Sequence, residues 1–180
     1  MEYDLINLFD HLICLFELIP ATVVTLGTEG TNQCVIQVEW RRSASDEATN
    51  TELTLKWDLD AIRARNPLID RQIQSRRERD EDQATRTEET AIVVAVAVLA
   101  HIEPETRLTF RSRTGSGHDF YLNDTREEMI EMAGKWVYGL PGLFEETRRQ
   151  SNQNQTLRKR WVSVTVMREK PRNRTEGLHE

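Results

Sequence analysis

Apolar residues near the start of the chain follow two different spacings. From 3 to 19 they recur every three or four positions, which predicts an amphipathic helix that ends before Pro20. Two Val- and Ile-rich segments, 21–26 and 33–40, flank a Gly-Thr-Glu-Gly turn and predict a β-hairpin. The apolar face of the predicted helix is wide, so we expect it to pack into the core or against a protein partner.

The next segments alternate between structured and polar stretches. Residues 51–57 place Leu53, Leu55 and Trp57 on one side and predict a third strand, and 59–65 predict a short helix. Residues 75–87 are dense in charges of both signs, which suits an exposed helix or a mobile connector, and we favour a solvated connector.

An unbroken apolar run occupies residues 91–100, and periodicity alone does not separate a buried strand from a buried helix there. Its length, its recurring alanines and a possible capping box at 85–88 favour a helix. Its many valines argue the other way, since β-branched side chains are stiff in helices.

Three short strands are predicted between residues 106 and 136. Residues 106–113 alternate, with Leu108 and Phe110 on one face. A Gly-rich turn precedes the second strand, 118–123, and a tight loop at 124–126 leads to the third strand, 127–136.

The tight loop fixes which residues of the second hairpin oppose each other. A three-residue loop pairs Tyr121 with Met129 and Asp119 with Glu131, and it leaves Phe120 and Ile130 on the core-directed face. Opposed side chains have Cβ atoms ~4.5–5.5 Å apart, and like charges there repel. The pairing that buries the apolar residues therefore brings two carboxylates together. A cation, a shared proton or water could compensate.

The last segments predict a helix, a strand and a tail. An amphipathic helix is expected from Pro141 to about Leu157, and strict alternation over 160–168 predicts a strand. The residues after Pro171 are basic and then acidic, and we expect a loose tail.

Composition indicates one soluble domain with a local charge imbalance. The 180 residues are 38% hydrophobic and 30% charged, with a net charge of -6. The acidic total argues against indiscriminate binding to nucleic acid, although residues 141–180, which hold 9 basic and 5 acidic side chains, leave room for one phosphate-facing patch. The apolar start lacks a basic region and a small-residue cleavage site and contains acids, so we expect no signal peptide, no membrane partner and a cytoplasmic location.

From Thr87 onward the predicted order is helix, three strands, helix and strand. This order resembles the core of the PD-(D/E)XK nuclease superfamily, the restriction-endonuclease-like fold, over roughly the second half of the chain. The resemblance implies an α/β (α+β) fold in which a helical acid, an Asp on the second strand and a Glu on the third hold Mg²⁺. The matching positions are Glu89 (or Glu88), Asp119 and Glu131.

The resemblance also sets the expected organisation of the domain. Residues 88–170 would form the αβββαβ core, and residues 1–74 would add an N-terminal helix and β-hairpin extension. The charged connector would span 75–87 and the loose tail 171–180.

One position departs from the superfamily pattern. The pattern places a lysine two residues after the Glu, where this sequence has Ala133, and Lys135 lies a further two residues along, at ~13 Å from Glu131. Arg111 or Arg113 on the adjacent strand could meet phosphate instead, or could line an exposed strand edge. Glu89 also has a structural explanation, because acids near a helix N-terminus are favoured by the helix dipole.

Two functions follow as expectations. The first is a Mg²⁺-dependent nuclease acting on DNA, with catalytic Asp119, Glu131 and Glu89, metal held by Asp119 and Glu131, and phosphate bound by Arg111 and Arg113. The second is a catalytically inactive nuclease-like domain that serves as a binding or adaptor module, with a protein partner at the N-terminal helix.

Overall fold

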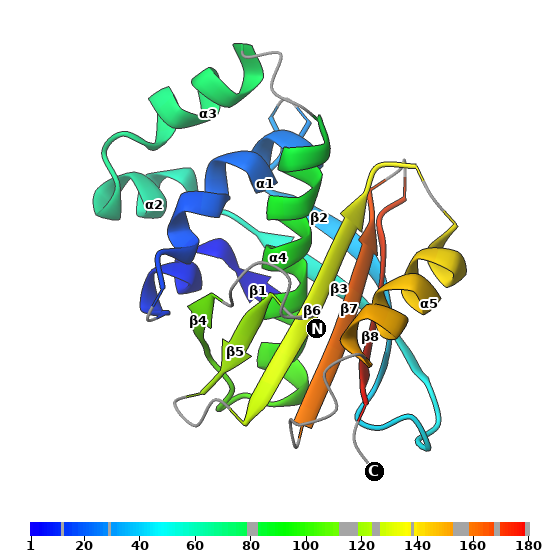
Figure 1. Cartoon of the computed structure of the whole chain (residues 1–180). Helices are drawn as coiled ribbons and strands as arrows, with labels where there is room; N and C mark the ends of the chain where they lie inside the picture. Colours follow the sequence, from blue (N-terminus) through cyan, green and yellow to red (C-terminus); the bar gives the residue numbers. More distant parts are fainter. Residues whose placement is uncertain are drawn as a thin grey trace.

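All the described strands join one mixed sheet, in the order β1-β3-β2-β8-β7-β6-β5-β4 (Figure 1). The computed structural model describes residues 1–11, 13–28, 30–78, 83–111, 119–123, 127–137, 139–152, 159–167 and 170–178. The strands are β1 (Glu2–Asp4), β2 (Gln33–Arg41), β3 (Thr49–Lys56), β4 (Leu108–Arg111), β5 (Phe120–Leu122), β6 (Glu128–Lys135), β7 (Lys159–Val166) and β8 (Arg172–Gly177). The α-helices are α1 (Ile19–Leu26), α2 (Leu59–Arg65), α3 (Ile69–Glu78), α4 (Gln83–Ile102) and α5 (Leu140–Ser151). The fold is therefore mixed α/β.

Helix α4 is the centre of the larger core. It packs against β6 and β7 of the sheet and against α1, and eleven of its twenty residues are buried. A helix that is apolar nearly all round is expected to be buried in this way. The predicted helix is confirmed, but it begins at Gln83, so the proposed capping box at 85–88 is wrong. The Thr87 hydroxyl instead donates to the Gln83 carbonyl, at 2.6 Å.

Gly134 lets α4 approach β6 closely. A Cβ at this position would lie 2.5 Å from the Thr87 carbonyl oxygen and 2.7 Å from the Ala91 Cβ. Real Cβ atoms do not tolerate such distances. The close contact therefore requires glycine, and it fixes how the helix lies on the strand.

The other face of the sheet is covered by α5 (Figure 1). Leu143 and Phe144 of the helix pack against Val162 and Val164 of β7 in a second, smaller core. Strands β6 and β7 are parallel, and α5 is the crossover between them. Residues of β6 therefore alternate between the α4 side and the α5 side.

The N-terminal segment differs from its predicted structure. The single helix expected over 3–19 is wrong, because β1 is followed by two 3-10 turns, Leu5–Asp10 and Leu15–Leu18. Leu5, Leu8 and Leu15 are buried in the main core, so these leucines pack into the core, which was one of the two expected alternatives.

Only the second strand of the predicted hairpin at 21–40 is confirmed. Residues 33–41 form β2, whereas the segment expected as its partner strand is helix α1. Pro20 lies in the first turn of α1 and so begins a helix, since proline is tolerated there. The hairpin partner of β2 is β3, and the predicted side of β3 is confirmed because Leu53 and Leu55 are fully buried.

The charged segment over 75–87 is largely helical in its described residues, so the helical alternative is right and the favoured connector is wrong there. Its first residues end α3 and its last residues begin α4, whereas 79–82 lie outside the described residues. Strands from both sides of this segment share the sheet through the parallel pairing of β2 with β8.

The expectation of a loose tail is wrong. Residues Arg172–Gly177 form β8, which lies between β2 and β7. The Asn173 amide donates to Ser163 Oγ, the Val164 carbonyl and Thr165 Oγ1, at 3.0–3.1 Å. These buried bonds satisfy the polar side chains that β7 and β8 turn toward each other.

None of the helices in the described part of the chain combines the length and the apolar character needed to span a membrane.

Candidate functional site

Asp119 opposes Glu131 where strand β5 begins. The register pairs Phe120 with Ile130 and Tyr121 with Met129, and the Asp119 N–H donates to the Ile130 carbonyl at 3.0 Å. The predicted register of the hairpin is therefore confirmed. Glu131 pairs with Val162 of β7, so Glu131 projects on the side of the sheet that α5 covers.

The Asp119 side chain, one residue before β5, adds a hydrogen bond to β6. Its Oδ2 atom accepts a hydrogen bond from the Met132 N–H at 2.7 Å. This bond satisfies a main-chain donor of β6, and it fixes the Asp119 carboxylate beside the strand that carries Glu131. Carboxylates that accept from main-chain N–H groups are well oriented.

Glu131 is the electrostatically unusual acid of the pair. Burial, and then the neighbouring charge of Asp119, raise the pKa of Glu131 to about 7. Its Oε2 atom is buried and accepts no hydrogen bond from any described residue. A half-buried carboxyl with an unsatisfied oxygen favours either a proton or a cation at this position.

A hollow of about 780 Å³ opens beside Asp119, which lines it, whereas Glu131 is not among its lining residues. The hollow crosses β6 at residues 132–135, which lie past the first residue of β5 and are not paired with that strand. Residues of α4 and of α5 form two of its walls. Its lining also includes residues 13–15, 17 and 18 of the N-terminal segment. The polar side chains that matter for chemistry are Cys14, Glu17, Glu88, Glu89, Arg111, Asp119, Lys135, Glu146 and Gln150.

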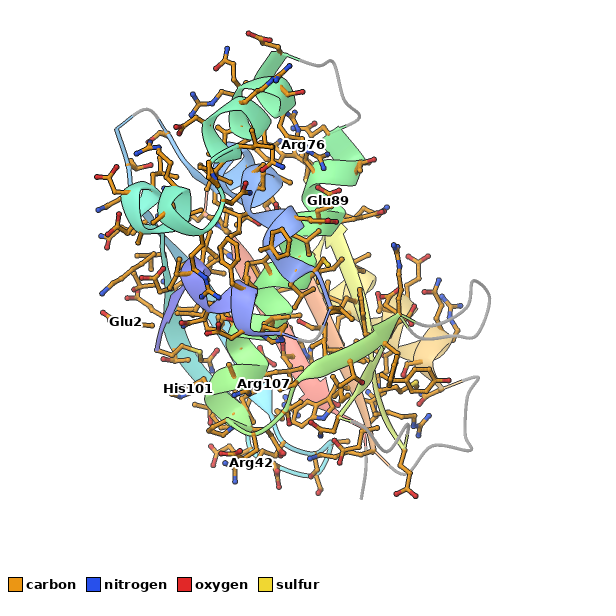
Figure 2. All side chains as sticks on the ribbon, turned by 90° about the vertical axis from the view of Figure 1, so that its left-hand side faces the viewer. Glu2, Arg42, Arg76, Glu89, His101 and Arg107 are labelled. Carbon is orange, nitrogen blue, oxygen red and sulfur yellow. The ribbon has the colours of Figure 1, made fainter. Side chains whose placement is uncertain are left out.

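Glu89 reaches the same hollow as Asp119 but is engaged in an ion pair. Its Oε1 atom lies 3.2 Å from Arg76 Nη2, and the two side chains are half-buried. Both are labelled in Figure 2, between α3 and α4. The pair ties α3 to α4 and gives Glu89 a structural role. Glu88, the alternative helical acid, is exposed and lines the same hollow.

Arg111 lines the hollow at the end of β4, but the strand is less regular than expected. The β4–β5 register shifts between Leu108 and Phe110, so the two do not share a face. Leu108 is buried, whereas Phe110 is 43% exposed, and the predicted common face is wrong. Arg111 then pairs with Phe120. Arg113 lies outside the described residues.

Ala133, which stands where the superfamily pattern has a lysine, lines the hollow. Ala133 and Lys135 both line it, on the face of β6 that carries Glu131. The sequence therefore located the relevant strand face. The sequence did not indicate that Cys14 and Glu17 also line the hollow, because only long-range packing brings the N-terminal segment to it.

The lining of the hollow is more acidic than basic. Five acids contribute, against two bases, Arg111 and Lys135. Glu89 is neutralised by Arg76, but the remaining acids still outnumber the bases. An acidic cavity attracts cations and repels phosphate unless a metal ion is bound.

Asp119 and Glu131 would provide two protein ligands for a cation. Among the described residues, no group of three or more His, Cys, Asp or Glu side chains is placed to hold a metal ion. Mg²⁺ is usually bound through one or two carboxylates and keeps several waters, so Asp119 and Glu131 fit this ion better than they fit zinc.

No protein-family model, curated protein or solved structure matches this chain.

Proposed function

We propose that this protein is a Mg²⁺-dependent nuclease of the PD-(D/E)XK type that hydrolyses phosphodiester bonds of DNA. The observation that carries the proposal is the direct opposition of Asp119 and Glu131, with a buried Glu131 oxygen that lacks a hydrogen-bond partner among the described residues. The order of elements from α4 to β7 supports it, since helix, three strands, helix and strand follow one another as in that fold.

Asp119 and Glu131 would hold the ion. A bound Mg²⁺ supplies charge stabilisation and a more acidic water at a scissile phosphodiester. The chain contributes the position of the two ligands. The Met132 N–H orients the Asp119 carboxylate, and Glu131, whose pKa is about 7 without the ion, would bind the ion in its ionised form.

The basic side chains of the hollow would meet the substrate. Arg111 and Lys135 are the cations in its lining, and both can contact phosphate oxygens. Glu89 would have a structural role, because its ion pair with Arg76 holds α4, which lines the hollow, against α3. Because the other side chains are acidic, we expect DNA to bind poorly unless Mg²⁺ is present.

A metal titration tests the proposal. Mg²⁺ and Mn²⁺ should each raise the melting temperature of the wild-type protein and lower the pKa of Glu131, because the ion binds the ionised carboxylate. Asp119→Asn combined with Glu131→Gln should abolish the shift, since the amides keep the size of the side chains but lose their charge. Mg²⁺-dependent nicking of supercoiled plasmid should disappear in the same variant.

Glu47→Gln is the matched control, because Glu47 is an exposed acid distant from the pair in sequence and absent from the lining of the hollow. It should respond to Mg²⁺ as the wild type does. A flat melting temperature in the wild type would remove the nuclease proposal, and plasmid nicking that survives the double change would remove the assignment of its residues.

The second candidate is a non-catalytic binding module with the same architecture. Ala133 in place of the lysine is the observation that favours it, together with the acidic lining. A module of this kind would bind Mg²⁺ or a cationic partner without cleaving DNA. Stable metal binding with no plasmid nicking under any Mg²⁺ or Mn²⁺ concentration would select it.

A further inference from the structure

A second hollow lies at the opposite end of α4 from Gln83, and it shares no lining residue with the first. Its volume is about 390 Å³. The first residues of the chain, the C-terminal turns of α4 and the turn before β4 enclose it. The lining residues are Glu2, Tyr3, Asn7, Asp10, His11, Ala97, Ala100, His101, Pro104 and Arg107.

Small residues create this space. Ala97 and Ala100 form the helical side of the hollow, whereas most neighbouring positions of α4 carry valine, leucine or isoleucine. Tyr3 and His11 lie opposite them, with the Tyr3 hydroxyl 3.4 Å from His11 Nε2. The volume exceeds that of a single water molecule many times over and admits a small polar ligand.

Arg107 is the best-placed cation of this hollow. Its Nη1 atom donates to the carbonyls of Pro104 and Thr106, at 2.6 and 2.9 Å, which holds the guanidinium in place. Its Nε and Nη2 groups donate no hydrogen bond to any residue that the structure describes. A fixed guanidinium with two N–H groups available matches the two oxygens of a phosphate or carboxylate.

The surrounding side chains supply further donors. His101 is exposed at the end of α4, and Figure 2 shows it and Arg107 at the same end of the helix as Arg42. Burial raises the pKa of Tyr3 well above its ordinary value, so the hydroxyl keeps its proton. Burial, and then Arg107, lower the pKa of His11, so this ring is neutral at pH 7, and its Nε2 atom lies 3.4 Å from the Tyr3 hydroxyl.

Two acids that line this hollow, Glu2 and Asp10, form ion pairs with basic side chains that do not line it. The Glu2 carboxylate lies 2.7 Å from Lys56 Nζ, and Asp10 lies 3.2 Å from Arg65. A helix C-terminus disfavours anions through its carbonyl groups. Here the Ile102 carbonyl accepts from Arg42 Nη2 at 3.2 Å and the Leu99 carbonyl accepts from the Glu103 N–H at 2.7 Å.

We propose that this hollow binds the phosphate group of a small phosphate monoester, through Arg107 and His101 with the Tyr3–His11 pair behind them. Two N–H groups of Arg107 meet two phosphate oxygens, and His101 meets a third. The ion pairs of Glu2 and Asp10 are exposed to solvent and neutralise these acids only in part, so a single phosphate is preferred over a diphosphate. This site is separate from the Asp119–Glu131 pair, and neither proposal depends on the other.

The test is a titration of the full chain with inorganic phosphate and with phenyl phosphate at constant ionic strength. The ring signals of His11 and His101 in NMR spectra report binding. Both should move with phenyl phosphate, and inorganic phosphate should bind more weakly because it fills less of the hollow. Pyrophosphate should bind more weakly than phenyl phosphate.

Arg107→Gln should weaken binding of phenyl phosphate at least about tenfold, since the charged fork is lost. Arg71→Gln is the control, because Arg71 is an exposed arginine of α3 that does not line the hollow. His101→Gln, at an exposed position, should weaken binding severalfold and covers the case in which Arg107→Gln fails to fold. Unmoved histidine signals in the wild type, or equal binding by the Arg107 and Arg71 variants, would overturn the proposal.

Discussion

Asp119 lies one residue before β5 and beside Glu131 of the antiparallel strand β6, and Glu131 projects toward α5. The Asp119 carboxylate is held by the Met132 N–H, whereas the Glu131 Oε2 atom has no hydrogen-bond partner in the described part of the chain. One acid of the pair is thus oriented by the backbone, and the other is left with a raised pKa. This asymmetry decides how the pair responds to pH, to metal and to substitution.

The first prediction concerns the pH dependence of stability. Folding raises the pKa of Glu131 from 4.5 to about 7, so the folded state binds the proton more tightly than the unfolded state does. The contribution of this group to stability is therefore fully present below about pH 4.5 and is lost as the pH rises through about 7. Replacing the acid by Glu131→Gln should stabilise the protein at pH 8 by roughly 2–3 kcal/mol and change little at pH 5. Urea unfolding at both pH values measures the difference.

Glu105→Gln is a suitable control for this comparison, because Glu105 is exposed and makes no ion pair among the described residues. It should leave the free energy of unfolding nearly unchanged at both pH values. An equal effect of Glu131→Gln at pH 5 and pH 8 would contradict the assignment of the raised pKa.

The second prediction separates the two causes of that raised pKa. Burial is the larger cause and the charge of Asp119 the smaller. Asp119→Asn removes the charge but keeps an oxygen for the Met132 N–H. The pKa of Glu131, followed by the ¹³C shift of its carboxyl carbon, should fall only part of the way toward 4.5. A return to the ordinary value would show that charge outweighs burial.

The sequence was most informative where local rules decide the structure. A three-residue loop and the two-residue period of strands are enough to predict that Asp119 opposes Glu131, and the register that this requires is confirmed for the adjoining pairs, Phe120 with Ile130 and Tyr121 with Met129. The buried side of β3 and the helical state of residues 91–100 follow from the same kind of local pattern.

Local rules failed where tertiary packing decides the structure. The apolar spacing over 3–19 suits a helix, but its leucines are buried through two 3-10 turns after β1 pairs with β3, more than fifty residues away. The charged sequence of 172–177 suits a tail, yet β8 lies inside the sheet, where β2 and β7 satisfy its main chain. The register shift in β4, which turns Phe110 outward, likewise leaves no signal in the sequence.

The third prediction concerns the missing lysine. Ala133 lines the hollow on the strand face that carries Glu131, so a longer side chain at this position can reach the open space. Ala133→Lys should raise Mg²⁺-dependent nicking of supercoiled plasmid at least about tenfold if the wild type is a weakened nuclease. Ala133→Met is the control, because it adds similar length without charge. Equal activity of the two variants would favour the binding module instead.

The fourth prediction concerns the packing of α4 on β6. Gly134→Ala places a methyl group 2.5 Å from the Thr87 carbonyl oxygen, so the helix or the strand must move. We expect a loss of about 1–3 kcal/mol in the free energy of unfolding. Gly139→Ala serves as the control, since no heavy atom lies within 4 Å of the added carbon. Similar midpoints of urea unfolding for both variants would show that this contact is looser than described.

The last prediction tests whether β8 is a central strand. Asn173 is 1% exposed, and its amide donates to three acceptors on β7, while its Oδ1 atom accepts from the Thr175 hydroxyl. Asn173→Ala removes a hydrogen-bond partner from each of these buried groups, of which the Ser163 and Thr175 hydroxyls keep only each other, so we expect a loss of about 2–4 kcal/mol. Asn50→Ala, at an exposed position of β3, should cost well under 1 kcal/mol. Because a loose tail would make the two substitutions equivalent, urea midpoints that agree between them would place residues 172–177 outside the sheet.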